Sequence, residues 1–553
     1  MRTRHAFKLH LPAWAGGAAL AAVVCVTRLP LLSAWPGEPD SAWFVLGGRQ
    51  WSRFGASAPQ VYDRVFSPGY YWLAARLNAG SQDIVQLSWR LNLFSLAAAL
   101  LTAWFIWELG KRLTLPAAAF WSGIVFLLGP AVWWLGLEPH PQGPAMALFL
   151  AAMLSFVAAY PQPRTAAAAA RFPLVRYRYL WLLASLLLLA ASLLLRADGV
   201  LALLIFPVLA ARSRSRQPGQ IYGEDSGVRP SGGDSDARRH RVWAWLRRSR
   251  EGWLLGAAAS LLFFFGRAAL LHTSWRQSQS QSWRAIAGYL GRVNWGKQLL
   301  PVLTAPGVLV WPAILAGLLY GLRRRGRTWA AHWLPPALAF SLPPYVFWLL
   351  VRGNNCRHVA LYSLIWLWPA AEAGGGWGRR RLPALAAALL ALNFLIIPAS
   401  SNLTLYPSGN VFSSARRLHR RERQIAQLTT RWLDRAAFAP APACYLGAAT
   451  TPYVLWSISR QAPARFWLTG RGAGDVHARL RWAVPTHPVL HLWFPGVYSR
   501  RGLRRYASAC PDWFSLEFTP NGRRRYFLAR RLHALMAVHR GHWLWIWRTR
   551  RGF

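Results

Sequence analysis

The chain has 553 residues and a mass of 62.1 kDa, and its composition is unusually apolar. Hydrophobic residues make up 54% and charged residues only 15%, whereas about 25% of a soluble domain is charged. Lys and Arg number 65 against 18 Asp and Glu, for a formal net charge of +47. The apolar content excludes a disordered chain, and the long Leu, Ala and Trp runs exclude a nucleic-acid-binding module as the main interpretation. The remaining class is a membrane protein with many spans.

Eleven apolar runs qualify as membrane spans, because a helix needs roughly 20 apolar residues to cross a hydrocarbon core of about 30 Å. The fifth and sixth runs are joined only by Arg196-Ala197-Asp198, so they form either a re-entrant pair or one long broken helix. The runs lie near 12–34, 90–109, 115–137, 143–160, 178–195, 199–211, 253–271, 299–321, 331–351, 358–373 and 382–399.

Every second loop between these runs is basic, beginning with Arg2, Arg4 and Lys8 ahead of the first run. Because Lys and Arg mark cytoplasmic loops, the N-terminus is predicted inside and, after eleven spans, the C-terminus outside. The Ser-, Gly-, Arg- and Asp-rich segment 212–252 is predicted as a disordered cytoplasmic linker, and 272–298 as an outer loop.

The pattern changes after the membrane module, which is predicted over residues 1–400. Short apolar runs at 443–446, 488–491 and 543–547, separated by Gly and Pro, are typical of strands. Residues 401–553 are therefore predicted as a small extracytoplasmic α/β domain, and the whole chain as a mostly α polytopic bundle that carries it.

Acidic residues are scarce, and six of the 18 fall in outer loops close to span ends. Two of them, in Glu38-Pro39-Asp40, follow the first span directly. Two carboxylates separated by a rigid proline suit a general base or a divalent-cation site. An N-cap role for Asp40, at the start of a helix over 41–51, is an equally weighted interpretation that is compatible with either. The six are Glu38, Asp40, Asp63, Asp83, Glu138 and Asp198.

The rest of the first outer loop, 35–89, supplies a context for this motif. The amphipathic pattern over 43–53 predicts a helix on the membrane interface, and Ser67-Pro68-Gly69-Tyr70-Tyr71 follows it. This layout resembles the first outer loop of the C-type (GT-C) glycosyltransferases, a superfamily that includes bacterial protein O-mannosyltransferases and lipid A aminoarabinose transferases. Members move a sugar from a polyprenyl-phosphate donor to an acceptor on the outer face.

Three later motifs extend the resemblance. They are Glu138-Pro139-His140 in the second outer loop, Arg196-Ala197-Asp198-Gly199 between two spans, and Arg357-His358 at the start of the tenth span. Each also has a structural interpretation, because arginines at helix ends usually reach toward lipid headgroups, and Arg196 with Asp198 can be a simple ion pair.

The resemblance implies an inverting membrane glycosyltransferase of the bacterial inner membrane with its active site outside. Asp40 is the expected base, with Glu38 as second choice or metal ligand, and a divalent cation stays open as cofactor. The expected partners are a polyprenyl-phosphate sugar, membrane lipids, and a lipid, glycan or protein acceptor. Arg357, His358 and Arg196 are expected to hold the donor phosphate, and Glu138, His140, Asp198, Tyr70 and Tyr71 to contact substrate or metal.

Two rival functions remain open. A transporter or lipid-linked-glycan flippase also needs many spans, although the span centres here are nearly free of charge and no two matching halves are evident. A scaffold that binds an anionic polymer would leave the Glu38-Pro39-Asp40 motif without a purpose. Cys444 and Cys510 can bond if their domain is outside, but their spacing does not require it.

Overall fold

The structure is a computed structural model of the full chain, and the features below concern the residues that it describes. These are 14–32, 39–55, 66–78, 84–160, 177–215, 234–273, 310–350, 356–374, 385, 388, 444–447, 466–468, 489–493, 515–518, 524–527 and 545–549. Glu38, the apolar run at 382–399 apart from two residues, and the predicted loop at 272–298 beyond residue 273 lie outside them.

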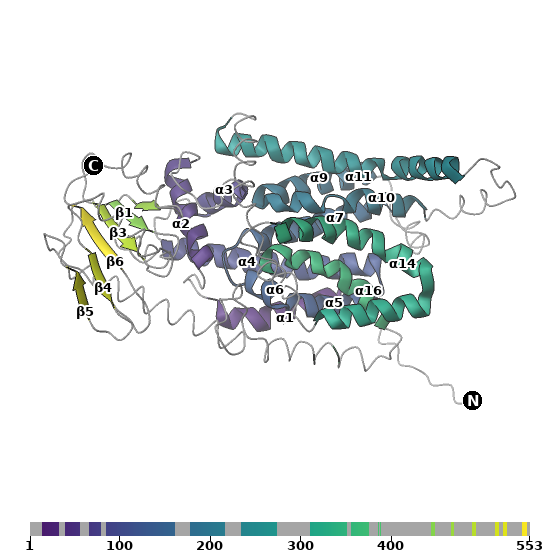
Figure 1. The fold of residues 1–553 in the computed structure, drawn as a ribbon, viewed down its shortest axis with the longest axis horizontal. Helices are drawn as coiled ribbons and strands as arrows, with labels where there is room; N and C mark the ends of the chain where they lie inside the picture. The colour runs from purple at the N-terminus through teal and green to yellow at the C-terminus, as the bar shows by residue number, and fades with distance from the viewer. Residues whose placement is uncertain are drawn as a thin grey trace.

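The described part of the chain is a helix bundle followed by short strands (Figure 1). The helical elements are α1 (Ala15–Arg28), η1 (Leu29–Leu31), α2 (Pro39–Phe54), α3 (Pro68–Leu77), α4 (Ile84–Leu113), α5 (Pro116–Leu127), α6 (Pro130–Leu135), α7 (Gln142–Ala158), α9 (Arg178–Leu195), η5 (Ala197–Ala202), α10 (Ile205–Ser215), α11 (Asp234–Leu271), α14 (Val310–Leu350), α15 (Cys356–Val359), η6 (Ala360–Ser363) and α16 (Leu364–Gly374). The strands are β1 (Cys444–Gly447), β2 (Phe466–Leu468), β3 (Val489–Trp493), β4 (Ser515–Phe518), β5 (Arg524–Phe527) and β6 (Trp545–Thr549).

The protein is an integral membrane protein. Among the described residues, four helices are long and apolar enough to cross a membrane, namely α4, α9, the 243–271 part of α11, and α14. Shorter apolar helices accompany them. The mostly α, polytopic fold that the sequence predicts is confirmed, while the number of spans stays a prediction.

Helix α7 occupies the centre of the bundle. Its buried residues cover every face of the helix, from Gln142 to Val157, and it packs against α4 and α9. An all-round apolar helix is expected to lie inside a larger assembly of helices. The residues just before α7 are buried too, so the second predicted outer loop enters the bundle.

The apolar run at 115–137 is not one straight span, which corrects the sequence prediction. Helix α5 ends at Leu127, and α6 begins at Pro130, the first residue after an extended Gly129. Proline lacks the amide hydrogen that would continue α5, and it is well suited to the first position of a new helix. The break directs the chain toward Glu138 and His140.

The ambiguous fifth and sixth runs form an antiparallel pair, as three contacts with α11 establish. Arg178, the first residue of α9, pairs with Glu251, and near the end of α9 the Leu194 side chain lies against Gly266. The chain then returns, because Pro207 in α10 contacts Gly252. Fourteen residues of α11 separate its two glycines, about 21 Å along a helix. The pair is therefore a hairpin and not one broken helix.

Helix α14 joins the two apolar runs predicted at 299–321 and 331–351. Its two arms meet at Gly326, whose φ of 72° and ψ of −166° are not helical. Glycine tolerates this positive φ without strain. Figure 1 shows the chain turning back at this point, so that the second arm runs in the opposite direction to the first.

The predicted disordered linker at 212–252 is partly helical, which is a second correction. Helix α10 continues to Ser215, and α11 begins at Asp234. Arg, Ala and Leu, which are frequent in the residues after Asp234, rank among the better helix formers. Only 216–233 of the predicted linker lies outside the described residues.

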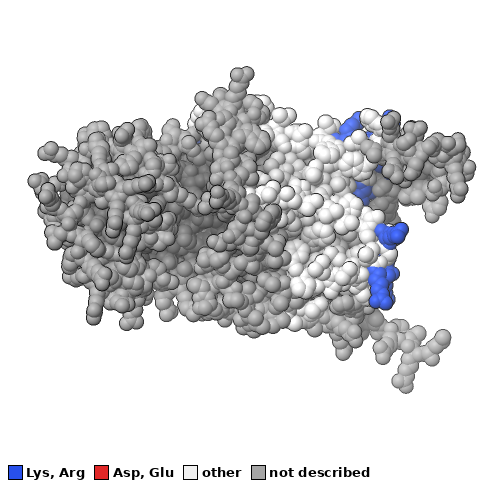
Figure 2. Space-filling view, in the orientation of Figure 1, with Lys and Arg blue, Asp and Glu red and all other residues white. Residues whose placement is uncertain are grey.

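Basic side chains gather at one end of the bundle, opposite α2 and α3 (Figure 2). At this end Glu108 pairs with Lys111, and Glu372 pairs with Arg325. This clustering agrees with the alternation of basic loops from which the sequence orientation was inferred. The exposed members are Arg112, Arg247, Arg248, Arg250, Arg323, Arg324, Arg325 and Arg327.

The six strands form two sheets near the end of the bundle that carries α2 (Figure 1). The larger has the order β2-β1-β3-β6, with β1 parallel to β2 and β3 and with β6 antiparallel to β3. Strands β4 and β5 pair separately and antiparallel. Strands were predicted at 443–446, 488–491 and 543–547, and β1, β3 and β6 lie there within two residues. The limits of the predicted domain at 401–553 and the pairing of Cys444 with Cys510 lie outside the described residues.

Candidate functional site: a cavity at the turn after α9

The turn after α9 begins the candidate site. Arg196 ends the leucine-rich helix in an extended conformation, with φ −154° and ψ 109°, and Asp198 lies in the first turn of η5. Arg196 Nε donates to Asp198 Oδ1 over 3.1 Å, with both side chains largely buried. The ion pair predicted from the sequence is therefore present, and it fixes the direction of the guanidinium.

The first outer loop docks on this turn. The Ala197 amide donates to the carbonyl of Phe66 over 2.9 Å, and Arg196 Nη1 lies 3.5 Å from Ser67 Oγ. Helix α3 starts at the next residue, Pro68. A Cβ on Gly69 would lie 2.9 Å from the carbonyl oxygen of Leu194, so only glycine fits this close approach. The Ser67-Pro68-Gly69 sequence thus serves to seat α3 against the turn.

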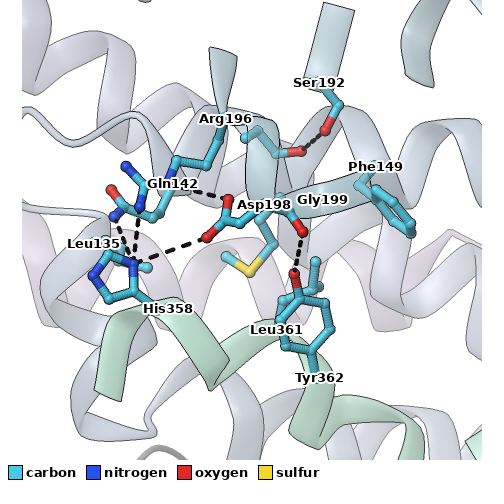
Figure 3. Close-up of a pocket in the computed structure, with 12 residues that line it drawn as sticks. Leu135, Gln142, Phe149, Ser192, Arg196, Asp198, Gly199, His358, Leu361 and Tyr362 are labelled. Carbon is cyan, nitrogen blue, oxygen red and sulfur yellow. Dashed lines mark hydrogen bonds and ion pairs between the residues drawn. The ribbon is translucent and has the colours of Figure 1, made fainter. Parts of the chain in front are cut away.

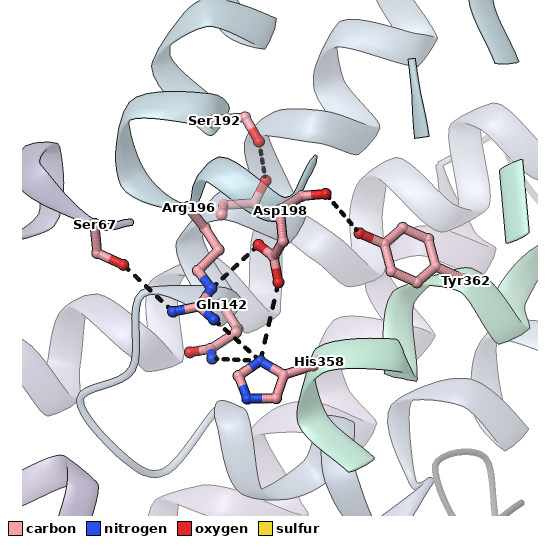
Figure 4. Close-up of polar contacts among 8 residues, drawn as sticks. Ser67, Gln142, Ser192, Arg196, Asp198, His358 and Tyr362 are labelled. Carbon is pink, nitrogen blue, oxygen red and sulfur yellow. Dashed lines mark hydrogen bonds and ion pairs between the residues drawn. The ribbon is translucent and has the colours of Figure 1, made fainter. Parts of the chain in front are cut away.

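His358 brings the last described helices into the site (Figure 4). Its Nδ1 lies 3.2 Å from Arg196 Nη2, 3.3 Å from Gln142 Nε2 and 3.9 Å from Asp198 Oδ2. A guanidinium has no acceptor, so Nδ1 must accept from Arg196, and the proton of the neutral ring resides on Nε2. The ring stacks on Trp348, with centroids 4.1 Å apart and an interplanar angle of 11°.

These polar groups line a small cavity (Figure 3). Its volume is about 40 Å³, enough for water but too small for a sugar ring. Tyr362 closes one side, with its hydroxyl 3.5 Å from the carbonyl oxygen of Asp198. Ser192 fixes the α9 wall by donating to the carbonyl of Ala145 over 2.8 Å. The lining combines the charged group of Arg196 and Asp198 with apolar side chains that include Phe149.

A second cluster lies around the Glu138-Pro139-His140 motif. Glu138 and His140 are fully buried. His140 Nε2 lies 3.2 Å from the Ser41 hydroxyl in the first turns of α2, and its ring packs edge-on against Phe44. The second outer loop is therefore joined to the start of α2, the helix whose second residue is Asp40.

Tyr70 and Tyr71 complete this cluster from α3, and both are fully buried. The Tyr70 ring packs edge-on against Phe44, and Tyr71 stacks on Trp51 with an interplanar angle of 10°. Burial raises the pKa of the Tyr70 hydroxyl, and the nearby charge of Glu138 raises it further, so the hydroxyl stays protonated. Tyr70 can therefore donate a hydrogen bond beside a carboxylate.

The two clusters are neighbours, because two short segments belong to both. Gln142 contacts His358 in the first cluster and follows His140 by two residues. Ser67 contacts Arg196 and precedes Tyr70 by three residues. One continuous region therefore contains residues from the first, second and third predicted outer loops and from the tenth predicted span.

Most of the predicted site residues fall in this region. Arg196, Asp198 and His358 meet around the cavity, and Glu138, His140, Tyr70 and Tyr71 form the second cluster. The backbone of Asp40 lies in the first turn of α2, which begins at Pro39, so the helix starts slightly before the predicted N-cap. The side chains of Asp40 and Arg357, and all of Glu38, lie outside what the structure describes.

Three site residues were not anticipated from the sequence, namely Ser41, Ser67 and Gln142. The only signal was local: Ser67 stands before a proline at a helix start, and Ser41 follows Asp40. Neutral polar residues at such places are common in any helical protein. Their partners are 99 and 129 residues away for the serines and 216 away for Gln142, and no sequence pattern reveals such pairs.

The described side chains include no group of three or more His, Cys, Asp or Glu that could hold a metal ion. Glu138 and His140 supply an oxygen and a nitrogen donor of the kinds that divalent metals accept. Any further ligands of such a site would come from residues outside the described side chains, and the sequence offers Glu38 and Asp40 as candidates. Metal use therefore stays a prediction.

Comparison with solved structures identifies the fold. The chain is similar to ArnT from Cupriavidus metallidurans bound to undecaprenyl phosphate, with a TM-score of 0.54 and 13% identity over 97% of this chain and 98% of that one. The apo form of ArnT gives 0.51 and 14% over the same shares. An oligosaccharyltransferase from Archaeoglobus fulgidus gives 0.45 and 10%, over 93% of this chain and 74% of that one. No protein-family model and no curated protein sequence matches the chain.

Proposed function

We propose that this protein, which has the fold of the C-type glycosyltransferases, transfers a sugar from a polyprenyl-phosphate donor to an acceptor at the extracytoplasmic face of the membrane. The observation that carries the proposal is the cavity where Arg196, Asp198 and His358 meet. A fixed guanidinium and an imidazole at the end of the spans suit a lipid phosphate, whose chain lies in the bilayer while its charge stays at the surface.

Arginine and histidine divide the phosphate chemistry between them. Arg196 offers a planar set of donors, held in place by Asp198 and by His358 Nδ1. Since Nδ1 accepts, His358 Nε2 carries a proton and is a donor for a phosphate oxygen. Arg357 is the neighbouring cation in sequence. Charge-assisted hydrogen bonds of this kind stabilise the negative charge that grows on the phosphate as the sugar leaves.

The first outer loop supplies the proposed base. The Asp40 carboxylate removes a proton from the acceptor hydroxyl or amine, the freed electron pair attacks the anomeric carbon, and the bond from that carbon to the phosphate oxygen breaks. The electrons of that bond leave with the polyprenyl phosphate, so no general acid is required. In-line attack inverts the anomeric centre. Glu38 is the second candidate for the base.

The second cluster is proposed to serve the acceptor side of the reaction. Ser41 and His140 join the start of α2 to the second outer loop, which brings the chain near Asp40 and Glu138 together. If a divalent cation takes part, Glu138, His140 and the loop carboxylates would hold it, and it would help to neutralise phosphate charge. Tyr70 and Tyr71 shape the apolar wall beside them.

The proposed placement of the site outside the cytoplasm is supported by the distribution of charge. The basic end of the bundle is proposed to face the cytoplasm by the positive-inside rule, and the cavity lies toward the other end, where α3 docks. The C-terminal strands lie near that same end (Figure 1). This arrangement is proposed for a bacterial inner membrane, with a lipid, glycan or protein as acceptor.

The experiment uses purified protein in liposomes with a polyprenyl-phosphate sugar that carries a radiolabel in the sugar. Transfer of the label from the lipid to water or to an added acceptor supports the proposal. A flippase, the rival function, would move the lipid across the bilayer with its sugar still attached. Loss of transfer in Arg196→Ala, with the protein still folded and inserted, assigns the activity to the cavity.

A further inference from the structure

Arg28, the last residue of α1, is completely buried. Its Nη2 donates to the carbonyl oxygens of Leu127 over 2.8 Å and of Val132 over 3.2 Å. Its Nε donates to the carbonyl of Trp133 over 3.1 Å. All three carbonyls belong to the broken third span, around 100 residues away in the chain.

The break in that span creates the need for such a donor. Carbonyl groups at a helix end have no partner within the helix, and an unpaired group in a bilayer costs several kcal/mol. Leu127 is the last residue of α5, and Val132 and Trp133 lie in α6. A cation at a helix C-terminus is also favoured by the helix dipole. One guanidinium therefore stabilises both sides of the break.

Gly136 shows how tightly this arrangement fits. A Cβ at Gly136 would lie 2.5 Å from Arg28 Nε and 2.8 Å from its Cδ. The guanidinium donates to three carbonyls, so it cannot move aside for an added methyl group without losing some of these hydrogen bonds. The glycine lies two residues before Glu138 and four before His140. Arg28 therefore contacts the segment that leads directly into these two residues.

We infer that Arg28 is a positioning residue, which fixes the position of the Glu138–His140 turn relative to the first outer loop. The inference deepens the proposed function and rests on it. Arg28 ends the helix that leads into the Glu38-Pro39-Asp40 motif, and its side chain holds the segment that leads into Glu138. A displacement of this segment would move the acceptor side of the site and leave Arg196 and His358 in place.

The test compares Arg28→Met, Arg28→Lys and Gly136→Ala with the matched control Arg178→Met. The control also removes an arginine fork, but at the opposite end of the bundle, where Arg178 pairs with Glu251. We expect the first three to lower kcat by about 10- to 100-fold while KM for the lipid donor stays within about twofold. Arg28→Lys should keep more activity than Arg28→Met, because lysine retains the charge but not the fork.

Hydrogen exchange of the backbone over 128–141 supplies a readout that does not depend on activity. Faster exchange confined to this segment in the Arg28 and Gly136 variants, with the control unchanged there, supports the inference. Faster exchange throughout the bundle, or a fall in kcat that only matches the loss of folded protein, overturns it. If the wild-type protein transfers no sugar, the proposed function fails, and the exchange result alone decides whether Arg28 positions the turn.

Discussion

Arg196 Nη2 lies 3.2 Å from Nδ1 of His358, although 162 residues separate the two along the chain. The contact joins the turn after α9 to the start of the last described helices, and Asp198 balances the charge beside it. An arginine that served only to anchor a helix in headgroups would point outward. Here the side chain is 7% exposed, so its orientation is set by the site.

The first prediction concerns this arginine. Arg196→Lys keeps the charge but loses the fork that meets Asp198, His358 and Ser67 at once. A hydrogen bond to a charged group contributes about 1.5–3 kcal/mol, so affinity for polyprenyl phosphate should fall about 10- to 100-fold. Binding is measured by competition with a labelled lipid in detergent micelles. Arg178→Lys, the control at the opposite end, should bind as the wild type does; equal weakening in both would argue against a phosphate site at Arg196.

The second prediction separates the two nitrogens of His358. Asn places an acceptor near the position of Nδ1 and so keeps the partner of Arg196, but it has no donor at the position of Nε2. His358→Asn should therefore weaken binding of polyprenyl phosphate by about tenfold, and His358→Ala by more. Stability against thermal unfolding should be nearly unchanged in His358→Asn. Indistinguishable binding in the two variants would contradict the role given to Nδ1.

The third prediction concerns the seat of α3. In Gly69→Ala the new methyl group would meet the Leu194 carbonyl at 2.9 Å, and overpacking of this kind costs about 1–3 kcal/mol. The matched control is Gly256→Ala in the interior of α11, where the nearest atom lies 3.7 Å away. Alanine there should stabilise the helix by about 0.5–1 kcal/mol. Thermal unfolding in detergent should move in opposite directions for the two variants, and a shared direction would exclude the close docking of α3.

The fourth prediction concerns the basic end. Glu251 accepts hydrogen bonds from both Arg178 and Tyr160. It therefore joins α11 to the start of α9 and to the residues just after the end of α7. Glu251→Ala should lower the free energy of unfolding by about 1–3 kcal/mol, because two partly buried donors lose their acceptor. Sugar transfer per folded molecule should stay at the wild-type value. A large change in KM for the donor would contradict this prediction, because it would show that the ion pair at this end affects donor binding at the site.

Much of the helical layout could be predicted from the sequence. The bounds of α9 coincide with the predicted run at 178–195 because Arg178 and Arg196 flank it, and charged residues end a span. The strands near 489 and 545 were predicted because short apolar runs stand between Gly and Pro turns. Arg196, Asp198 and His358 could be proposed together only because the order of their motifs resembled a known family.

Other features could not be predicted, for physical reasons. The break at Gly129-Pro130 has a local signal, since proline ends a helix, but nothing in the sequence shows that Arg28 supplies the missing donors. The helical start of α11 lies in a segment whose Ser, Gly and Asp content is typical of disorder. Contacts of Ser41, Ser67 and Gln142 depend on packing between distant elements, which residue type does not encode.

The central claim is tested most directly by following the sugar of a radiolabelled polyprenyl-phosphate donor in liposomes that contain the wild-type protein, Asp40→Asn or Arg196→Lys. We expect the wild-type protein to release the label from the lipid with inversion at the anomeric carbon, and both folded variants to lose most of this transfer. Label that stays on the lipid with the wild-type protein, under conditions where the lipid crosses the bilayer, would contradict it. Full transfer by folded Asp40→Asn would remove Asp40 from the role of base.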